Sequence, residues 1–334
     1  MTHLLALLFF FKASPAAAAI PVERLQAAAA YSSSHGGHAF LVMQNGRVLH
    51  ESYANGHAKG TAHRIYSGTK AFWCLAALAA EKDGLVNLNE PVSTTLTEWQ
   101  ADKPRSQITV RQLLDFSSGL PPMFGLHENT FKDRTAAALK APVAGTPGRS
   151  FIYGPASLQV WHEVLARKLR EKGQTPTRYL ERKVLSAVDL GPQRYLPDQK
   201  GAPLLASGFM LTARQWADLG QWVIKHKEVQ GALNGSANPA FGLGFWNNHA
   251  ASSTAREVDV ESMLDRPWAG QSWRGACLSR AAPADMLACI GSYGQRLYIV
   301  PSQKLVIVRL AQDKKPNDAL MLKLLFSGAP AKKD

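Results

Sequence analysis

Ser67 and Lys70 stand three residues apart in the segment RIYSGTKAFWCLAALAAEKDG, which covers residues 64–84. The chain after Lys70 is apolar at helical spacing and ends at Gly84, a typical helix stop. The apolar residues of this pattern are Phe72, Leu75, Leu78 and Ala79. Side chains three residues apart lie on the same face of a helix, so the hydroxyl and the amine can touch. A nucleophile and its base require this arrangement.

A lysine at the start of a buried helix can act as that base. A free lysine has a pKa of about 10.4, whereas a base that works at neutrality needs a pKa of about 7–8. Burial in apolar surroundings disfavours the ammonium form, so we predict that burial lowers the pKa of Lys70. The alternative is a helix-capping serine followed by a solvated lysine. No other lysine of the chain has a serine three residues before it.

Other hydrolytic systems are missing from the sequence. It contains no Gly-x-Ser-x-Gly motif, no His-Glu-x-x-His motif and no glycine-rich phosphate loop. His35 and His38 in HGGH could supply at most two ligands of a metal site, and a surface loop explains them better. We therefore expect neither a metal nor a cofactor.

The composition indicates a large folded core. The chain has 334 residues, of which 46% are hydrophobic and 19% charged, and its net charge is +13. The basic residues are scattered without a recognisable nucleic-acid module, so nucleic acid is not an expected partner. Cys277 and Cys289 flank a plausible hairpin, LSRAAPADMLA, and could be oxidised in an exported protein; Cys74 is expected to be a small buried hydrophobe.

The N-terminal segment LLALLFFFKASPAAAA, residues 4–19, is typical of a signal peptide. Its apolar core is too short to span a bilayer, and small residues follow that suit cleavage. We expect residues 1–19 to be removed and the protein to be periplasmic or secreted, with no stable membrane insertion afterwards. An uncleaved N-terminal anchor is the alternative.

The remaining elements predict an α/β (α+β) fold. Residues 38–56 predict a hairpin that turns at Asn45 and Gly46. Residues 296–311 predict two further strands joined through PSQK, and a helix follows near 317–326. Helices are predicted within 108–120, within 141–173 after a loop rich in proline and glycine, and within 204–226.

Strands at both ends and helices between them predict one antiparallel sheet built from both chain ends and flanked by helices. The middle of the chain would form an inserted, mostly helical subdomain. We expect a single domain over 20–334, with its sheet part at about 20–66 and 270–330 and its helical part at about 67–269.

The chain resembles the superfamily of serine β-lactamases and penicillin-binding proteins, particularly the branch of class C β-lactamases and esterases. The resemblance covers about residues 38–311 and depends on several blocks in the right order. These blocks are QNGRVLHESYANG, RIYSGTKAF, KDGLVNLNEPVS, ITVRQLLDFSSGL, FIYGPASLQ, ASGFMLTARQWADLG, FGLGFW and GSYGQRLYIVPSQKLVIVRL.

The resemblance implies a catalytic role for three residues. Ser67 matches the acylated nucleophile and Lys70 matches its partner. The second motif of the family, Tyr-x-Asn, is Tyr153-Gly154-Pro155 here, so the tyrosine is kept and the asparagine is lost. Tyr153 would relay the proton to the leaving group.

The third motif of the family, Lys-Thr-Gly or His-x-Gly, is poorly kept. Counting back without gaps from Pro301 places it at Met286-Leu287-Ala288, which departs at every position. This register implies an oxyanion hole formed by the N–H groups of Ser67 and Cys289, with Pro155, Met286 and Ala288 at substrate-binding positions. A shift of three residues, to Cys289-Ile290-Gly291, is the alternative register.

These departures weaken recognition of β-lactams and of D-Ala-D-Ala. We therefore expect a serine hydrolase that acts on small esters, or on linear amides as 6-aminohexanoate-oligomer hydrolases do. A DD-peptidase, a weak β-lactamase, and a non-catalytic binder or sensor with the same fold are the alternatives. The expected partner is a small ester or amide substrate.

Overall fold

A seven-stranded antiparallel sheet forms the centre of the protein, in the order β2-β1-β11-β10-β9-β6-β5. The structure is a computed structural model, which describes residues 19–235, 237–264, 272–312 and 316–328. The strands of this sheet are β1 (Gly37–Gln44), β2 (Arg47–Tyr53), β5 (Phe241–Gly242), β6 (Phe245–Asn247), β9 (Leu287–Gly291), β10 (Gln295–Val300) and β11 (Leu305–Ala311). Short strands also pair outside it: β3 (His63–Arg64) with β4 (Met210–Leu211), and β7 (Arg256–Glu257) with β8 (Ala276–Cys277).

The two ends of the chain meet in this sheet. β1 pairs with β11 along its length, for example Val42 opposite Ile307. Asn45 and Gly46 form the turn between β1 and β2, and both have a positive φ, as a two-residue hairpin turn requires. The predicted sheet built from both chain ends is therefore confirmed.

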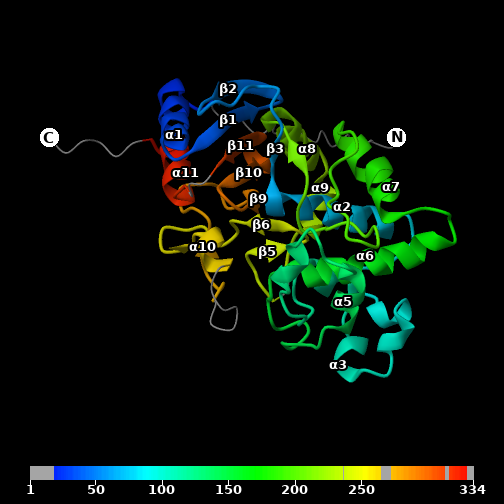
Figure 1. The fold of residues 1–334 in the computed structure, drawn as a ribbon. Helices are drawn as coiled ribbons and strands as arrows, with labels where there is room; N and C mark the ends of the chain where they lie inside the picture. Colours follow the sequence, from blue (N-terminus) through cyan, green and yellow to red (C-terminus); the bar gives the residue numbers. More distant parts are fainter. Residues whose placement is uncertain (1–18, 236, 265–271, 313–315, 329–334) are drawn as a thin grey trace, which may run out of the picture.

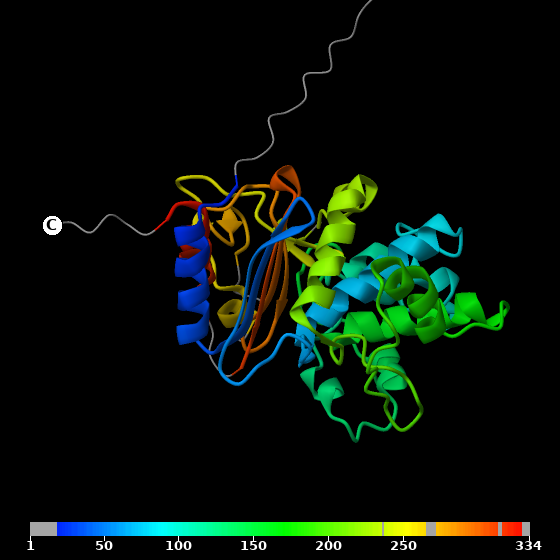
Figure 2. The ribbon, with the colours of Figure 1, turned by 90° about the horizontal axis from the view of Figure 1, so that it is seen from above.

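Helices cover both faces of the sheet. α1 (Val22–Ser34) and α11 (Asp318–Phe326) pack together on one face, and α8 (Ala213–Lys225) packs against β10 and β11 on the other. Figure 2 shows α1 and α8 on opposite sides of the strands. Every residue of β10 and of β11 is buried, because a sheet covered on both faces excludes water from both.

The rest of the chain forms a helical region beside the sheet (Figure 1). Its helices are α2 (Thr69–Lys82), α3 (Lys103–Ser106), α4 (Val110–Leu114), α5 (Arg134–Lys140), α6 (Pro155–Arg170) and α7 (Pro176–Leu180). Two short helices follow α8: α9 (Lys227–Ala232) and α10 (Val260–Leu264). β5, β6 and α8 come from the stretch 67–269 that was expected to be helical, yet they pack with the sheet.

Two local predictions were wrong. The helix predicted within 108–120 is only α4, because the chain enters the left-handed region at Phe116 and again at Gly119. Cys277 is not in a hairpin with Cys289: it lies in β8, which pairs in parallel with β7. All three cysteines are buried and unbonded, so the disulfide considered above is absent.

The predicted signal peptide lies outside the described residues, apart from Ala19. In the described part of the chain, no helix combines the length and the apolar character needed to cross a bilayer.

Candidate active site

Ser67 lies in a 3₁₀ turn, Tyr66–Gly68, that leads directly into α2. Tyr66 has a φ of 47°, a left-handed conformation that non-glycine residues rarely adopt and that is often found at functional sites. Gly68 packs closely on α8, since a Cβ there would lie 2.7 Å from the ring of Trp216. The side chain of Ser67 itself is only half-buried, so a ligand can reach it.

Lys70 lies one turn into the helix and contacts Ser67. Its Nζ is 2.8 Å from Ser67 Oγ and donates a second hydrogen bond to the carbonyl of Ala206 at 3.0 Å. The side chain is 2% exposed, and this burial lowers the pKa of Lys70 to about 7. The amine is therefore neutral in a large share of molecules at pH 7, and in that form it can accept the proton of the serine.

Tyr153 completes the group around Lys70. Its ring centre lies 4.7 Å from Lys70 Nζ, and it forms a hydrogen bond with Ser67. Burial raises the pKa of Tyr153 well above its ordinary value, while the hydrogen bond with Ser67 acts in the opposite direction. The phenol therefore keeps its proton at neutral pH and can donate it, whereas the neutral amine of Lys70 can accept one.

The end of β9 lies against the Ser67 turn. A Cβ added at Gly291 would be 2.2 Å from the carbonyl oxygen of Ile65, so only glycine allows this approach. Just beyond it, the ring of Tyr293 packs 5.1 Å from the ring of Tyr66. The shifted register, Cys289-Ile290-Gly291, is therefore the one that the structure places beside Ser67.

The strand pairing corrects the expected role of Cys289. The N–H of Asn248, just after β6, donates to the carbonyl of Met286, just before β9, at 2.9 Å, so residue 286 is directed at the β6 side and the odd-numbered residues of β9, such as Gly291, are directed at β10. Hydrogen-bonded pairs alternate along an antiparallel ladder, so Cys289 and Leu297 form one of them. The N–H of Cys289 is directed at β10 and is not available to an oxyanion.

Ser292 offers the N–H that Cys289 cannot. By the same alternation, its N–H is directed away from β10, and β6 pairs with β9 only at Leu287 and Ala288. Among the described residues, no protein acceptor takes the backbone N–H of Ser292 or that of Ser67. Sequence reasoning missed Ser292, although the three-residue shift in register would have indicated it.

Two of the three positions expected to bind substrate, Met286 and Ala288, lie away from the end of β9 that contacts the Ser67 turn. Met286 and Ala288 are fully buried at the other end of β9, about 10–17 Å from Gly291 at ~3.3 Å per residue. Ala288 is paired with Trp246 of β6 and Tyr298 of β10. Pro155 is the buried first residue of α6, where its missing N–H is tolerated. Met286 and Ala288 therefore lie in the core, whereas Pro155 follows Tyr153 by two residues and its substrate-binding role stays a prediction.

A buried carboxyl group lies behind the lysine. Asp115 accepts the backbone N–H of Leu243 at 2.9 Å, and burial raises its pKa to about 6. The adjacent Cys74 is one helical turn beyond Lys70, and burial raises the pKa of its thiol too. In the described part of the chain, no acidic residue and no thiolate forms an ion pair with Lys70. Burial is therefore the largest influence on the pKa of Lys70, and the smaller influence of Cys74 acts in the opposite direction.

A basic cavity of about 840 Å³ opens next to the aromatic residues around Tyr153. The ring of Phe151, which lines it, is 6.3 Å from the ring of Tyr153. Arg149, His249 and Arg274 are exposed on its wall, and no acidic residue is among its described lining residues. The cavity is therefore suited to an anionic group. Among the residues that the structure describes, no group of His, Cys, Asp or Glu could hold a metal ion.

This fold and this serine–lysine pair define a serine hydrolase whose nucleophile opens a buried helix. The chain belongs to the beta-lactamase family, whose model matches residues 22–326.

The relatives are distant. "Protein flp" of Staphylococcus aureus is 23% identical over 244 residues, which are 68% of this chain and 44% of that protein. The chain thus spans less than half the length of the curated relatives it matches.

Solved structures show the same fold. One is EstCE1, described as a hydrolase with promiscuous acyltransferase activity, with a TM-score of 0.64 and 16% identity over 91% of this chain and 98% of that one. Another, from Bacillus anthracis, is named for 6-aminohexanoate-dimer hydrolysis; its TM-score is 0.59, with 18% identity over 90% of this chain and 78% of that one.

Proposed function

We propose that the protein hydrolyses small esters or linear amides through an acyl-enzyme on Ser67. The observation that carries this proposal is the 2.8 Å contact between Ser67 Oγ and a lysine whose pKa burial lowers to about 7. A neutral amine at this distance can take the serine proton as the oxygen attacks a carbonyl carbon.

The first half of the reaction forms the acyl-enzyme. The negative charge that develops on the carbonyl oxygen is stabilised by the N–H groups of Ser67 and Ser292. Tyr153 donates its phenolic proton to the leaving alcohol or amine, and the proton held by Lys70 restores the phenol. The bond to the leaving group breaks, and the acyl group remains on Ser67.

The second half releases the acid. A water molecule takes the place of the leaving group and attacks the acyl carbon. The proton that this water loses passes to the relay formed by Tyr153 and Lys70. The serine oxygen is then the leaving group and recovers its proton. Lys70 and Tyr153 thus transfer a proton in both halves of the cycle, and the direction of the transfer in the second half is the reverse of that in the first.

The surroundings of the site support esters and linear amides over β-lactams. Pro155 has neither the side-chain amide nor the N–H that the family's asparagine position would offer. The residues of β9 beside Ser67 carry no cation that could hold a β-lactam carboxylate. EstCE1 is described as a hydrolase with promiscuous acyltransferase activity, and the Bacillus anthracis protein is named as a 6-aminohexanoate-dimer hydrolase, which agrees with this choice.

The basic cavity suggests a feature of the substrate. Phe151 on the cavity wall is 6.3 Å, ring centre to ring centre, from Tyr153. We propose that an extended substrate acylating Ser67 places a carboxylate in this cavity, where Arg149 and Arg274 are exposed. We therefore expect a lower KM for linear substrates that end in a carboxylate than for neutral analogues of equal length.

A substrate panel on the wild type and Ser67→Ala tests the proposal. It contains p-nitrophenyl acetate and butyrate, linear amides with and without a terminal carboxylate, nitrocefin and a D-Ala-D-Ala peptide. Repeated turnover of esters or amides, lost in Ser67→Ala, is the expected result. Release of at most one equivalent would indicate a binder, and release of D-Ala would indicate a DD-peptidase.

Export is a separate proposal. The apolar segment at 4–19 supports cleavage near residue 19, and N-terminal sequencing of protein recovered outside the cytoplasm tests it. A mature chain that still begins at Met1 and stays with the membrane would favour an anchor.

A further inference from the structure

The turn from Ser292 to Gly294 joins β9 to β10 and carries the proposed oxyanion donor. Buried side chains hold all of its carbonyl groups. Gln295 Nε2 donates to the carbonyls of Ser292 at 3.3 Å and Tyr293 at 3.2 Å, and Arg309 Nη1 donates to that of Gly294 at 2.6 Å. The carbonyl side of the turn is therefore fixed.

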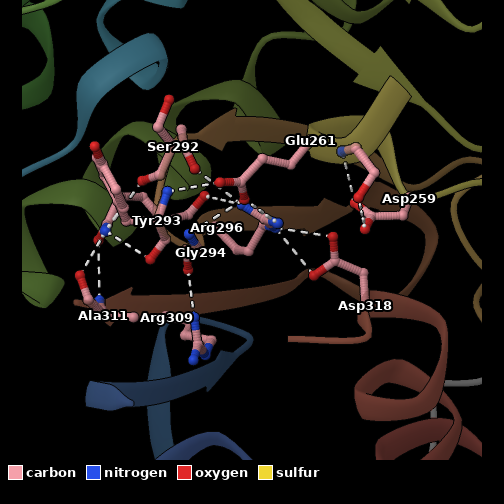
Figure 3. A network of polar contacts seen from close by, with 12 residues as sticks. Asp259, Glu261, Ser292, Tyr293, Gly294, Arg296, Arg309, Ala311 and Asp318 are labelled. Atoms are coloured by element: carbon pink, nitrogen blue, oxygen red, sulfur yellow. Dashed lines mark hydrogen bonds and ion pairs between the residues drawn. The ribbon is translucent and has the colours of Figure 1, made fainter. Parts of the chain in front are cut away.

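Glu261 holds the N–H side of the same turn (Figure 3). Its Oε1 accepts the N–H of Tyr293 at 2.7 Å, and its Oε2 accepts that of Gly294 at 3.3 Å. Of the three backbone N–H groups in the turn, only that of Ser292 has no described protein acceptor. By the alternation described above it is directed away from β10, and the adjacent Gly291 lies against the carbonyl of Ile65, beside the Ser67 turn.

The carboxylate of Glu261 is itself held in place. Arg296 Nη2 donates to Glu261 Oε2 at 2.9 Å, and Arg296 Nε donates to both oxygens of Asp318 at 2.9 Å. Arg296 is fully buried, and both carboxylates are nearly so. A charged hydrogen bond between buried groups is stronger and more rigid than one at the surface.

The side chain of Glu261 is not needed to cap its own helix, α10. Asp259 accepts the N–H of Ser262 at 3.3 Å and the hydroxyl of Ser262 at 2.6 Å, which caps the start of α10. The side chain of Glu261 instead reaches across to β9 and β10 (Figure 3). Among the described residues, its side-chain hydrogen bonds are with the turn and with Arg296.

We propose that Glu261 is a positioning residue for the oxyanion hole: it binds the N–H groups of Tyr293 and Gly294 and so holds the Ser292 N–H toward the reacting carbonyl. The proposal rests on the proposed function. Glu261 touches no substrate. Its loss lets the turn move, which weakens stabilisation of the tetrahedral intermediate in both halves of the cycle.

The test compares Glu261→Gln with the matched variant Asp318→Asn. Both remove one negative charge from the pair that binds Arg296, but only the first alters the contacts with the turn. We expect both variants to lower Tm. Glu261→Gln should lower kcat for a p-nitrophenyl ester ~10–100-fold with KM changed less than about threefold, below the 10²–10³-fold effect of removing an oxyanion donor. Asp318→Asn should keep kcat within about threefold.

Two further readouts do not depend on ester turnover. The first is the rate at which a fluorophosphonate labels Ser67: an oxygen–phosphorus bond forms, fluoride leaves, and the serine proton passes to Lys70. This rate should fall in Glu261→Gln and not in Asp318→Asn. The second is hydrogen exchange of the segment 291–296, which should speed up only in Glu261→Gln. If this variant does not fold, Glu261→Asp, which is shorter by one methylene, should show a smaller loss of the same kind.

The outcomes separate the two proposals. Equal losses of kcat and labelling in both variants, or unchanged values in Glu261→Gln, would overturn the role of Glu261. A wild type that labels on Ser67 but turns over no substrate would overturn the proposed function, and the labelling rates would still decide the role of Glu261. A wild type that neither labels nor turns over substrate would overturn both.

Discussion

Lys70 Nζ lies 2.8 Å from Ser67 Oγ, and no described carboxylate forms an ion pair with it. Arg296 is buried as deeply but has the carboxylates of Glu261 and Asp318 at 2.9 Å. The pKa values of the two groups therefore shift in opposite directions, although burial alone lowers both. Burial lowers the pKa of Lys70, whereas the paired carboxylates overcome burial and raise that of Arg296. Lys70 can therefore accept a proton near neutral pH, whereas Arg296 remains charged.

The first prediction concerns the pH dependence of hydrolysis. Only neutral Lys70 accepts the serine proton, so kcat/KM for a neutral ester should rise with pH and level off above about 7. Lys70→Arg keeps a cation that cannot be deprotonated, so it should lose as much activity as Lys70→Ala. A steady-state pH profile measures both effects. A Lys70→Arg enzyme with near wild-type activity would show that Lys70 is not the base.

The second prediction concerns stability. The pKa of Lys70 is about 7 in the folded protein, whereas an unfolded lysine titrates near 10.4. Between these values the unfolded chain binds one more proton, so the stability of the wild type rises with pH. Lys70→Met removes this dependence, and the wild type should lose about 1.4 kcal/mol per pH unit relative to it as pH falls from about 10 to 7.

Urea unfolding of both proteins at several pH values measures this difference. Other groups titrate in both proteins alike, so their effects cancel in the comparison. A difference that does not change with pH would mean that Lys70 is charged in the folded protein.

Much of the fold and the serine–lysine pair could be predicted from the sequence. Asn45-Gly46 specifies a hairpin turn by its backbone preference, and a Ser-x-x-Lys spacing at a helix start brings the two side chains together whatever surrounds them. The hairpin turn and the serine–lysine contact each depend on residues that are close together in the sequence. Such local relationships can be predicted from the sequence directly.

The oxyanion hole could not be predicted in the same way. Whether Cys289 or Ser292 faces Ser67 depends on which residues of β9 bond to β10, and a gapless count from Pro301 does not determine this alternation. Glu261 depends on contacts between segments more than thirty residues apart. Only the three-dimensional arrangement shows them.

The third prediction tests the register of β9. A methyl group at Gly291 would overlap the carbonyl of Ile65, so Gly291→Ala should move the strand end away from Ser67 and lower kcat ~100-fold. Gly231→Ala is the matched control, because a Cβ there meets nothing within 4 Å. Ester kinetics and Tm of both variants give the comparison. Normal activity in Gly291→Ala would rule out this register.

The fourth prediction concerns β-lactams. Because Pro155 offers no amide and the end of β9 no cation, kcat/KM for nitrocefin should be at least ~100-fold below that for the best ester. Spectrophotometric assays of both substrates at one pH suffice. Nitrocefin hydrolysis as efficient as that of the best ester would refute this interpretation of the site.

The last prediction joins Tyr153 to Lys70. Tyr153→Phe keeps the ring, which packs 4.9 Å from that of Phe116 and 4.7 Å from Lys70 Nζ, and removes only the hydroxyl. Folding should therefore survive, with Tm near the wild-type value. Acylation should slow by ~10²–10⁴-fold, the range for a positioned acid or base. The pre-steady-state burst with p-nitrophenyl acetate measures that step.

The double variant Lys70→Ala/Tyr153→Phe tests whether the two residues act as one relay. Each passes its proton to or from the other, so removing either interrupts the whole path, and the effects of such residues are not additive. The double variant should thus be little worse than the worse single variant. Losses that multiply would mean that Lys70 and Tyr153 act independently, for instance Lys70 by its charge and Tyr153 by its packing. The proton path from Ser67 to the leaving group would then have to run through another residue.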